Sequence, residues 1–323
     1  MRRPPHRTGL ERPSENLTVR KPKNTEKGRG NEVNNPVAVS RTAGPGIGYF
    51  FQTRAMRLGA AERAIRAGKK MTVPKKVQLF HTCIINEVYP EVGLSVVNIL
   101  ERLGVEVEVP AAQTCCGQPA FNAGFHADAR KVARHTLDLL SATEGPIVIP
   151  SGSCGDMITH QYHMLFKDGP DGGEEPGYAA KAHAVSGRCY EFSVFLVDVM
   201  GITNLGARLG LKAAYHPSCH LLRGLGVKTQ PRALLAGVQG LECAEFKDQE
   251  ECCGFGGMFS VKNAAISTGM LENKLRNLEA SGAQAVVSCD MGCLMHMAGG
   301  LRRKGSKLQV KHISQLLEEG LKP

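Results

Sequence analysis

The sequence predicts an α/β protein of two homologous repeats, each with a parallel-type sheet flanked by helices, preceded by a disordered basic tail. From residue 77 onward, short apolar runs alternate with segments of helical periodicity, which is typical of parallel sheets with helices on their faces. Three cysteine landmarks also recur once along the chain, at a nearly constant spacing of 136 to 139 residues. This spacing is too long for a solenoid and indicates a duplicated domain.

The first 70 residues differ in composition from the rest of the chain. Residues 1–76 hold 18 Lys and Arg against 5 Asp and Glu, whereas the remainder holds 22 against 25. The weak apolar periodicity of residues 1–70 predicts a disordered basic tail or a misassigned start ahead of Met71. A transit peptide, or a weak contact with nucleic acid or an acidic partner, remains an alternative for this segment.

Composition also excludes several classes of function. The remainder of the chain has no basic cluster with interleaved aromatic residues, so nucleic-acid binding is not predicted. The sequence contains no uninterrupted apolar run of about 18 residues, and we predict no transmembrane segment. The N-terminus lacks the apolar centre of a secretory signal, so we expect a cytoplasmic protein. In a reducing compartment its 11 cysteines are typical of metal ligands or redox groups.

Residues 71–187 are predicted to form the first cysteine-rich α/β repeat. Its expected strands are Val77–Phe80, Val105–Val109 and Ile147–Ile149, and its expected helices are Pro90–Gly104 and Ala127–Leu140. The first of these helices has Val92, Val96 and Leu100 on one face, as packing against a sheet requires. Residues 167–187 start with Gly and charged residues, and we interpret them as a loop that ends the repeat.

Residues 188–323 are predicted to form the second cysteine-rich α/β repeat, after a connecting helix over Glu191–Met200. Its expected strands are Leu211–Tyr215, Leu241–Phe246, Ala285–Ser288 and Lys307–His312, and its expected helices are Pro231–Val238, Ala264–Ala280 and Ile313–Gly320. The same alternation of strand and helix therefore predicts the same architecture as in the first repeat.

The cysteine landmarks supply the candidate metal-binding residues. The first repeat carries HTC at 81–83, TCCG at 114–117 and PSGSC at 150–154, and the second carries HPSC at 216–219, ECCG at 251–254 and SCDMGC at 288–293. The candidate ligands are Cys83, Cys115, Cys116 and Cys154 in the first repeat, and Cys219, Cys252, Cys253 and Cys293 in the second. Because these cysteines follow predicted strands, where loops converge on ligands in parallel sheets, distant members of a set can meet.

Four thiolates per repeat is the number of ligands that an iron–sulfur cluster needs. The Gly after each Cys pair lets the backbone approach a bulky inorganic core, and helix N-termini after Cys154 and Cys293 would supply N–H groups. Zinc in at least one repeat is an alternative, because four thiolates also make a structural zinc site. A thiol–disulfide catalyst is a further alternative, although it does not explain the duplication.

Other cysteines and histidines lie near these motifs. Cys189 and Cys243 have no counterpart in the other repeat, and we interpret them as small apolar residues. Six histidines could ligate a cluster or tune it by hydrogen bonding, although each alone is expected to be structural or superficial. They are His81, His160, His163, His216, His220 and His296.

The duplicated pattern resembles the cysteine-rich Cys-Cys-Gly domain family, which includes a component of heterodisulfide reductase and the iron–sulfur subunits of glycolate oxidase and lactate utilisation. The phrases FHTCIINEVYPEVG, TCCGQPAFNAG, PSGSC, YHPSCHLLRGLG, ECCGFGGMFSVK and SCDMGCLMHM are most similar to the lactate-utilisation subunits, over about residues 75–322. The resemblance implies an iron–sulfur electron-transfer subunit, with 4Fe–4S the expected cluster type on the eight cysteines. It also implies an oxidoreductase complex that oxidises L-lactate to pyruvate with a second iron–sulfur protein and a third partner.

One departure from the broader family concerns the last motif of each repeat. That motif is usually Cys-x-x-Cys, and its first positions here are Ser151 and Asp290. Cys289 lies one residue away and is a further candidate ligand. Two alternatives remain open. A heterodisulfide or thiol–disulfide reductase would catalyse its reaction without partner subunits, whereas a zinc-stabilised scaffold would have no redox role.

Overall fold

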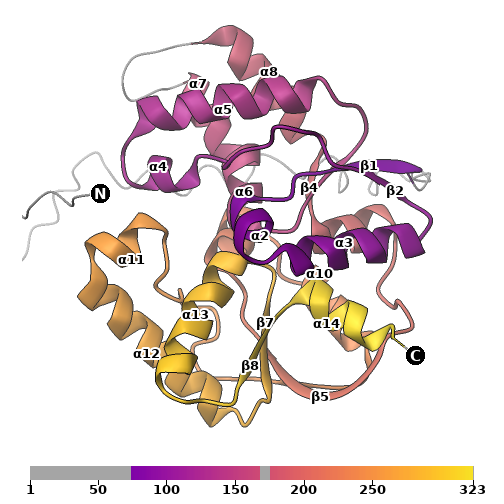
Figure 1. Cartoon of the computed structure of the whole chain (residues 1–323), viewed down its shortest axis with the longest axis vertical. Coiled ribbons are helices and arrows are strands. Elements are labelled where there is room, and N and C mark those ends of the chain that lie inside the picture. The colour runs from indigo at the N-terminus through magenta and orange to yellow at the C-terminus, as the bar shows by residue number, and fades with distance from the viewer. Residues whose placement is uncertain (1–73, 168–174, 323) are drawn as a thin grey trace, which may run out of the picture. The chain divides into compact units, whose positions relative to one another are not determined.

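The computed structural model describes residues 74–167 and 175–322 of the 323-residue chain (Figure 1). These residues form two four-stranded parallel sheets flanked by helices. The fold class predicted from the sequence, a duplicated α/β architecture, is thereby confirmed. The predictions made for residues 1–70 lie outside the described residues.

The two sheets have the same strand order. The first runs β2-β1-β3-β4 and the second runs β6-β5-β7-β8, with every neighbouring pair parallel. The strands are β1 (Lys76–Leu79), β2 (Glu106–Glu108), β3 (Ile147–Ile149), β4 (Cys189–Glu191), β5 (Arg208–Tyr215), β6 (Gln239–Ala244), β7 (Ala285–Ser288) and β8 (Gln309–His312). In each repeat the first strand therefore lies between the second and the third, and the fourth strand extends the sheet beyond the third.

Helices connect these strands and cover the sheets. In the first repeat they are α2 (Cys83–Val88), α3 (Pro90–Arg102), α4 (Gln118–Asn122), α5 (His126–Ser141), α6 (Gly152–Asp156), the π-helical turn η2 (Met157–Gln161), α7 (Tyr162–Lys167) and α8 (Pro176–Ser186). After β4 come α9 (Phe192–Val194) and the π-helical turn η3 (Phe195–Val199). The second repeat has the π-helical turn η4 (His220–Gly224), α10 (Gln230–Ala236), α11 (Met258–Lys262), α12 (Ala264–Ala280), α13 (Met291–Arg303) and α14 (Ile313–Gly320).

The inner strands are apolar because protein covers both of their faces. All residues of β3 and β7 are buried. The edge strand β2 instead carries Glu106 and Glu108 in exposed positions, and charges on an edge strand oppose pairing with another chain.

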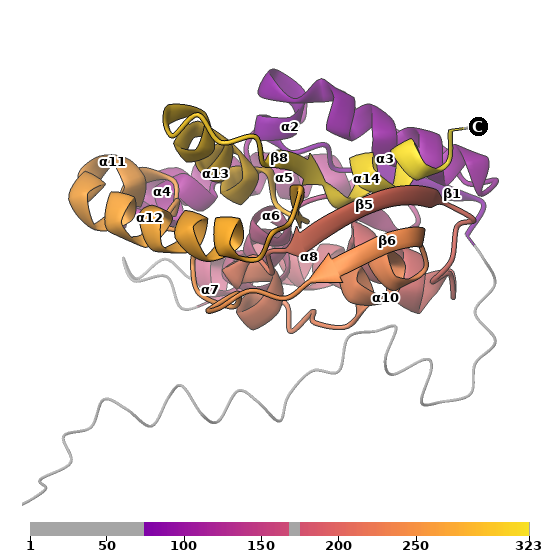
Figure 2. The same cartoon turned by 90° about the horizontal axis from the view of Figure 1, so that it is seen from below.

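One hydrophobic core contains residues of both repeats. It includes Val96 and Ile99 of α3 together with Ile313 and Leu316 of α14. These two helices lie side by side (Figures 1 and 2). The packing of α3 from the first repeat on α14 from the second therefore joins the repeats within one body.

Two predictions near the middle of the chain are wrong. The described part of the predicted loop at 167–187 contains the helix α8, and Pro176 suits its first turn because proline has no N–H to leave unpaired there. The predicted helix Glu191–Met200 is instead the end of β4 followed by α9 and η3. The Glu191 side chain accepts hydrogen bonds from the N–H groups of Ser193 and Val194, which starts α9 one residue after the strand.

The fourth strand bears on the predicted boundary between residues 187 and 188. β4 follows that boundary, yet it pairs in parallel with β3 of the first sheet. The first sheet thus extends past residue 188, and we propose that the first repeat ends after η3.

Candidate metal centre

All eight candidate cysteines line one cavity of about 360 Å³. The cavity lies where β1, β3, β5 and β7 end, and loops from both repeats form its walls. The cysteines are Cys83, Cys115, Cys116 and Cys154 from the first repeat, and Cys219, Cys252, Cys253 and Cys293 from the second. Residues that are far apart in the sequence thus meet at the carboxyl ends of the strands, as parallel sheets favour.

The first set of thiols is in mutual contact. The Sγ atoms of Cys116 and Cys154 are 3.3 Å apart, and Cys83 hydrogen-bonds to Cys115. The N–H of Gly117 donates to Cys115 Sγ at 3.4 Å. Hydrogen bonds from Cys116 and Cys83 lower the pKa of the Cys115 thiol to about 3, so this residue is a thiolate at neutral pH.

The second set repeats this arrangement. The Sγ atoms of Cys219 and Cys252 are 4.0 Å apart, and the N–H of Gly254 donates to Cys252 Sγ at 3.4 Å. Hydrogen bonds from Cys219 and Cys253 lower the pKa of Cys252 to about 2. In both repeats, the first Cys of the Cys-Cys-Gly motif is therefore the thiolate that its neighbours stabilise.

The glycines of the two motifs have a backbone conformation that other residues rarely adopt. Gly117 has φ +84° and Gly254 has φ +89°, both in the left-handed region that favours glycine. A residue with a side chain would be strained in this conformation, so glycine suits the position whose N–H contacts the sulfur two residues earlier.

Ser151 and Asp290 are the N-caps of the helices that carry the last cysteine of each set. The N–H of Cys154 donates to Ser151 Oγ at 3.3 Å. The N–H groups of Gly292 and Cys293 donate to Asp290 Oδ1 at 3.0 and 3.4 Å. A serine or aspartate just before a helix is a typical start signal, so the sequence did contain this information.

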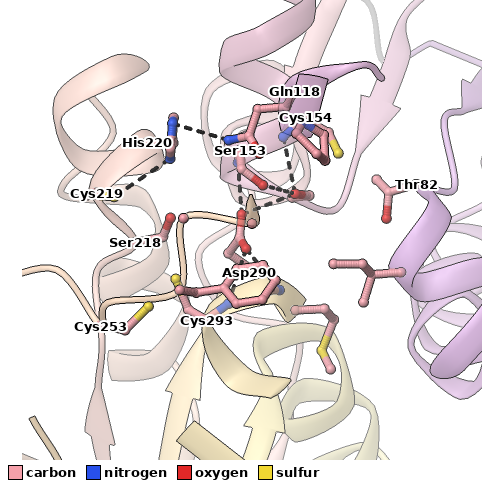
Figure 3. Close-up of a pocket in the computed structure, with 18 of the residues that line it drawn as sticks. Thr82, Gln118, Ser153, Cys154, Ser218, Cys219, His220, Cys253, Asp290 and Cys293 are labelled. Carbon is pink, nitrogen blue, oxygen red and sulfur yellow. Dashed lines mark hydrogen bonds between the residues drawn. The ribbon is translucent and has the colours of Figure 1, made fainter. Parts of the chain in front are cut away.

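These two caps also meet each other across the boundary between the repeats. Asp290 Oδ2 accepts hydrogen bonds from Ser151 Oγ at 3.1 Å and from the N–H of Ser153 at 2.8 Å. Figure 3 shows Asp290 reaching toward Ser153 from the segment that carries Cys293. Ser151 and Asp290 thus join the two repeats at the cavity.

The remaining cysteines lie away from the cavity lining. Cys289 is fully buried, and its Sγ is 3.8 Å from the hydroxyl of Tyr215. It is absent from the residues that line the cavity, as are Cys189 in β4 and Cys243 in β6. Among the described residues, the cavity therefore collects the eight cysteines that have counterparts in both repeats.

Two histidines lie close to the second set. His220 lines the cavity, with Nδ1 3.6 Å from Cys219 Sγ and Nε2 3.2 Å from Nε2 of Gln118 (Figure 3). His216 is fully buried, and a ring nitrogen lies within 4.8 Å of the sulfurs of Cys253 and Cys293. Burial, followed by the nearby Lys274 charge, lowers the pKa of His216 to about 3.

The other predicted histidines make contacts of a different kind. His160 Nδ1 is 2.9 Å from the carboxylate of Asp156, and His296 Nε2 is 3.4 Å from the hydroxyl of Ser267. His81 contacts its neighbour's carbonyl, and neither it nor His163 lines the cavity. No local sequence signal separated His216 from these residues, because its partner thiols come from distant motifs.

This donor set fits a metal centre. Thiolates are the ligands of iron–sulfur clusters and of structural zinc, and each repeat offers four thiols in contact. The N–H groups of Gly117 and Gly254 are aimed at sulfur, which stabilises negative charge there.

Within the described residues, no helix is long and apolar enough to cross a membrane.

Comparison with solved structures identifies a related fold. A hypothetical protein from Helicobacter pylori superposes with a TM-score of 0.54 at 12% sequence identity. The match covers 78% of this chain and 50% of the Helicobacter pylori chain. At this identity the likeness concerns the fold alone.

Comparison with protein families and curated sequences identifies closer relatives. The model of the CCG cysteine-rich domain matches twice, at residues 77–159 and 213–298. Lactate utilization protein A 2 of Bacillus cereus (strain Q1) is 44% identical over 246 residues, covering 76% of this chain and 99% of the relative. Lactate utilization protein A of Halalkalibacterium halodurans is 44% identical over 242 residues, covering 75% and 96%. The chain, which carries the CCG cysteine-rich domain in duplicate, therefore belongs to the lactate utilization protein A family.

Proposed function

We propose that this protein is the iron–sulfur electron-transfer subunit of an oxidoreductase complex that oxidises L-lactate to pyruvate. The observation that carries the proposal is the meeting of two equivalent sets of four thiols at a single cavity. The names of the relatives support lactate as the substrate of the whole system. A duplicated set of soft ligands is typical of a protein that holds more than one redox centre.

The residues of the chain have separable roles in this proposal. Each set of four cysteines would hold an iron–sulfur cluster, 4Fe–4S being the expected type, which supplies one-electron transfer when bound. Gly117 and Gly254 donate N–H groups to sulfur and so stabilise its negative charge. Ser151 and Asp290 hold the helix starts that carry Cys154 and Cys293.

Turnover by the complex would need partner subunits. We propose that the partners include a second iron–sulfur protein and that the complex works in the cytoplasm. A subunit that only passes electrons needs no lactate site of its own, so the partner that binds lactate would deliver the electrons. Removing the partners should then abolish lactate oxidation while leaving the clusters of this chain reducible by a chemical reductant.

The first experiment is anaerobic purification of the full chain, with iron, sulfide and zinc analysis and absorption and EPR spectra. We expect brown protein with stoichiometric iron and sulfide. Cys116→Ser and Cys253→Ser should each remove the iron of one repeat only. Cys243→Ser is the matched control, because this cysteine is exposed and outside the cavity, and it should keep the full iron content.

Colourless protein that holds zinc alone, and still lacks iron after anaerobic cluster reconstitution, would contradict the proposal. That outcome would favour a zinc-stabilised scaffold. Lactate-independent reduction of disulfides by the isolated chain would instead favour a thiol–disulfide reductase. Iron in one repeat with zinc in the other would confine electron transfer to a single centre.

A further inference from the structure

His216 and Phe80 occupy equivalent positions in the two repeats. Each lies three residues before the first cysteine of its set. The N–H of Phe80 donates to Val148 O at 2.9 Å, and the N–H of His216 donates to Val287 O at 2.7 Å. Both side chains are fully buried. The same place in the fold thus holds a phenyl ring in the first repeat and an imidazole in the second.

The surroundings of the imidazole are those of a metal ligand. One ring nitrogen of His216 and the sulfurs of Cys253 and Cys293 all lie within 4.8 Å of one another. The backbone of Gln249 hydrogen-bonds to one ring nitrogen with loose geometry, and within the described residues the other ring nitrogen has no partner. A fully buried polar group without hydrogen bonds is unfavourable unless another partner satisfies it.

The distances allow these three atoms to bind the same metal centre. Sulfur and nitrogen ligands lie about 2.3 and about 2.0–2.1 Å from a tetrahedral metal ion, so they are roughly 3.6–3.8 Å from one another. Even on a single ion the three atoms would have to draw together by about 1.2 Å at most, which side-chain rotation provides. Phe80 offers no ligand atom at the corresponding place beside Cys116 and Cys154.

We propose that His216 is a nitrogen ligand of the metal centre in the second repeat, whereas the centre in the first repeat is bound by thiolates alone. This inference rests on the proposed function, in that the cysteines hold iron–sulfur clusters. His216 would add a neutral nitrogen donor to the four thiols of the second set, whereas Phe80 adds no donor to the first.

The test is pulsed EPR of the full-length protein, purified anaerobically, reduced, and labelled with ¹⁵N at histidine. We expect one strongly coupled histidine nitrogen in the signal that Cys253→Ser removes. His216→Phe, which copies the first repeat, should lose this coupling and keep the iron. His220→Phe is the control for the other histidine near this set, and it should retain the coupling. Phe80→His should add a second coupled nitrogen to the other signal.

The outcomes separate this inference from the proposed function. Iron–sulfur signals without a coupled histidine nitrogen, or a coupling that His220→Phe removes instead, would overturn the inference alone. If His216→Phe fails to fold, His216→Cys keeps a ligand at this position and should still lose the coupling. A protein that holds only zinc would overturn the proposed function. X-ray absorption at the zinc edge would then test the ligand by itself. Loss of a nitrogen neighbour of zinc in His216→Phe would support His216 as a ligand, and zinc with sulfur neighbours alone would overturn it.

Discussion

The two repeats share a scaffold and differ in the groups around the thiols. Strand order, cysteine positions and the two motif glycines are the same in both. The second repeat has His216 where the first has Phe80, both fully buried. The matched cysteines are thus common to both repeats, whereas the residues packed around them differ.

A second difference places a positive charge beside the second set only. Lys274 is buried at 2% exposure, and its Nζ donates to the carbonyls of Asp248 and Gln249. Val132 of α5 lies against Gly117 as Met270 of α12 lies against Gly254. Thr136 follows Val132 by four residues and Lys274 follows Met270 by four, so Thr136 is the counterpart of Lys274. A positive charge favours the reduced, more negative state of a nearby cluster, so Lys274 would raise the potential of a centre held by the second set.

The largest expected effect concerns the caps that join the repeats. Asp290→Ala removes the acceptor for three N–H groups and the Ser151 hydroxyl, and should destabilise the protein by roughly 3–5 kcal/mol. Ser151→Ala should lose only about 1–2 kcal/mol, because Asp290 keeps its other donors. Chemical unfolding of the two variants measures the difference. Equal losses of unfolding free energy in the two variants would show that Asp290 contributes no more than Ser151 to the contact between the repeats.

The next effect compares the residues that end the fourth strands. Burial raises the pKa of Glu191 to about 7, so its stabilising effect is complete below pH 4.5 and is lost as pH rises to 7. Burial lowers the pKa of His312 to about 4, so its effect is complete above pH 6.5 and is lost as pH falls to 4. Each change amounts to about 3 kcal/mol over its range.

Substitution should flatten opposite sides of the pH profile. Glu191→Gln should remove the loss of stability between pH 4.5 and 7, and His312→Asn should remove the loss between pH 6.5 and 4. Both replacements retain an acceptor for the helix start. Unfolding midpoints of the two variants from about pH 4 to about pH 8, which spans both windows, provide the measurement. A parallel shift of the whole profile would mean that these groups do not titrate in this range.

A smaller difference separates the two motif glycines. A Cβ on Gly254 would lie 2.7 Å from the carbonyl oxygen of Ser267, whereas a Cβ on Gly117 would have no neighbour closer than 3.5 Å. Both alanine variants incur the strain of positive φ, roughly 1–2 kcal/mol. Gly254→Ala should lose about 2 kcal/mol more because of the backbone contact. Matching losses in unfolding experiments would contradict this account of the second repeat.

The smallest expected effect is that of the buried lysine. Lys274→Met removes two hydrogen bonds to backbone carbonyls and should destabilise the protein by roughly 1–2 kcal/mol. It should also lower the potential of the second centre and leave the first unchanged. Thr136→Val in the first repeat is the matched control, and a redox titration followed by EPR reads both centres. A shift of both potentials would show that the charge does not act locally.

The sequence predicted the parts of the fold that local patterns specify. α12, β3, β7 and α14 were predicted residue for residue, because apolar periodicity and flanking turns mark their ends. β4 was missed because three residues, Cys189–Glu191, give too short a pattern. The predicted helix over Glu191–Met200 overlooked that Glu191 caps a new helix after a strand.

The candidate site was predicted in part. Recurrence of the cysteine motifs was enough to select all eight cysteines that line the cavity. The contact of Asp290 with Ser151 joins residues from different repeats, and no local pattern encodes such a contact. The proximity of His216 to Cys253 and Cys293 likewise depends on how three separate loops converge.

A redox titration of the anaerobically purified protein, followed by EPR, tests the central claim that the chain holds two unequal centres. We predict two one-electron transitions, with Cys253→Ser removing the one at higher potential and Cys116→Ser the one at lower potential. A single transition, or two whose order is reversed in these variants, would contradict the account.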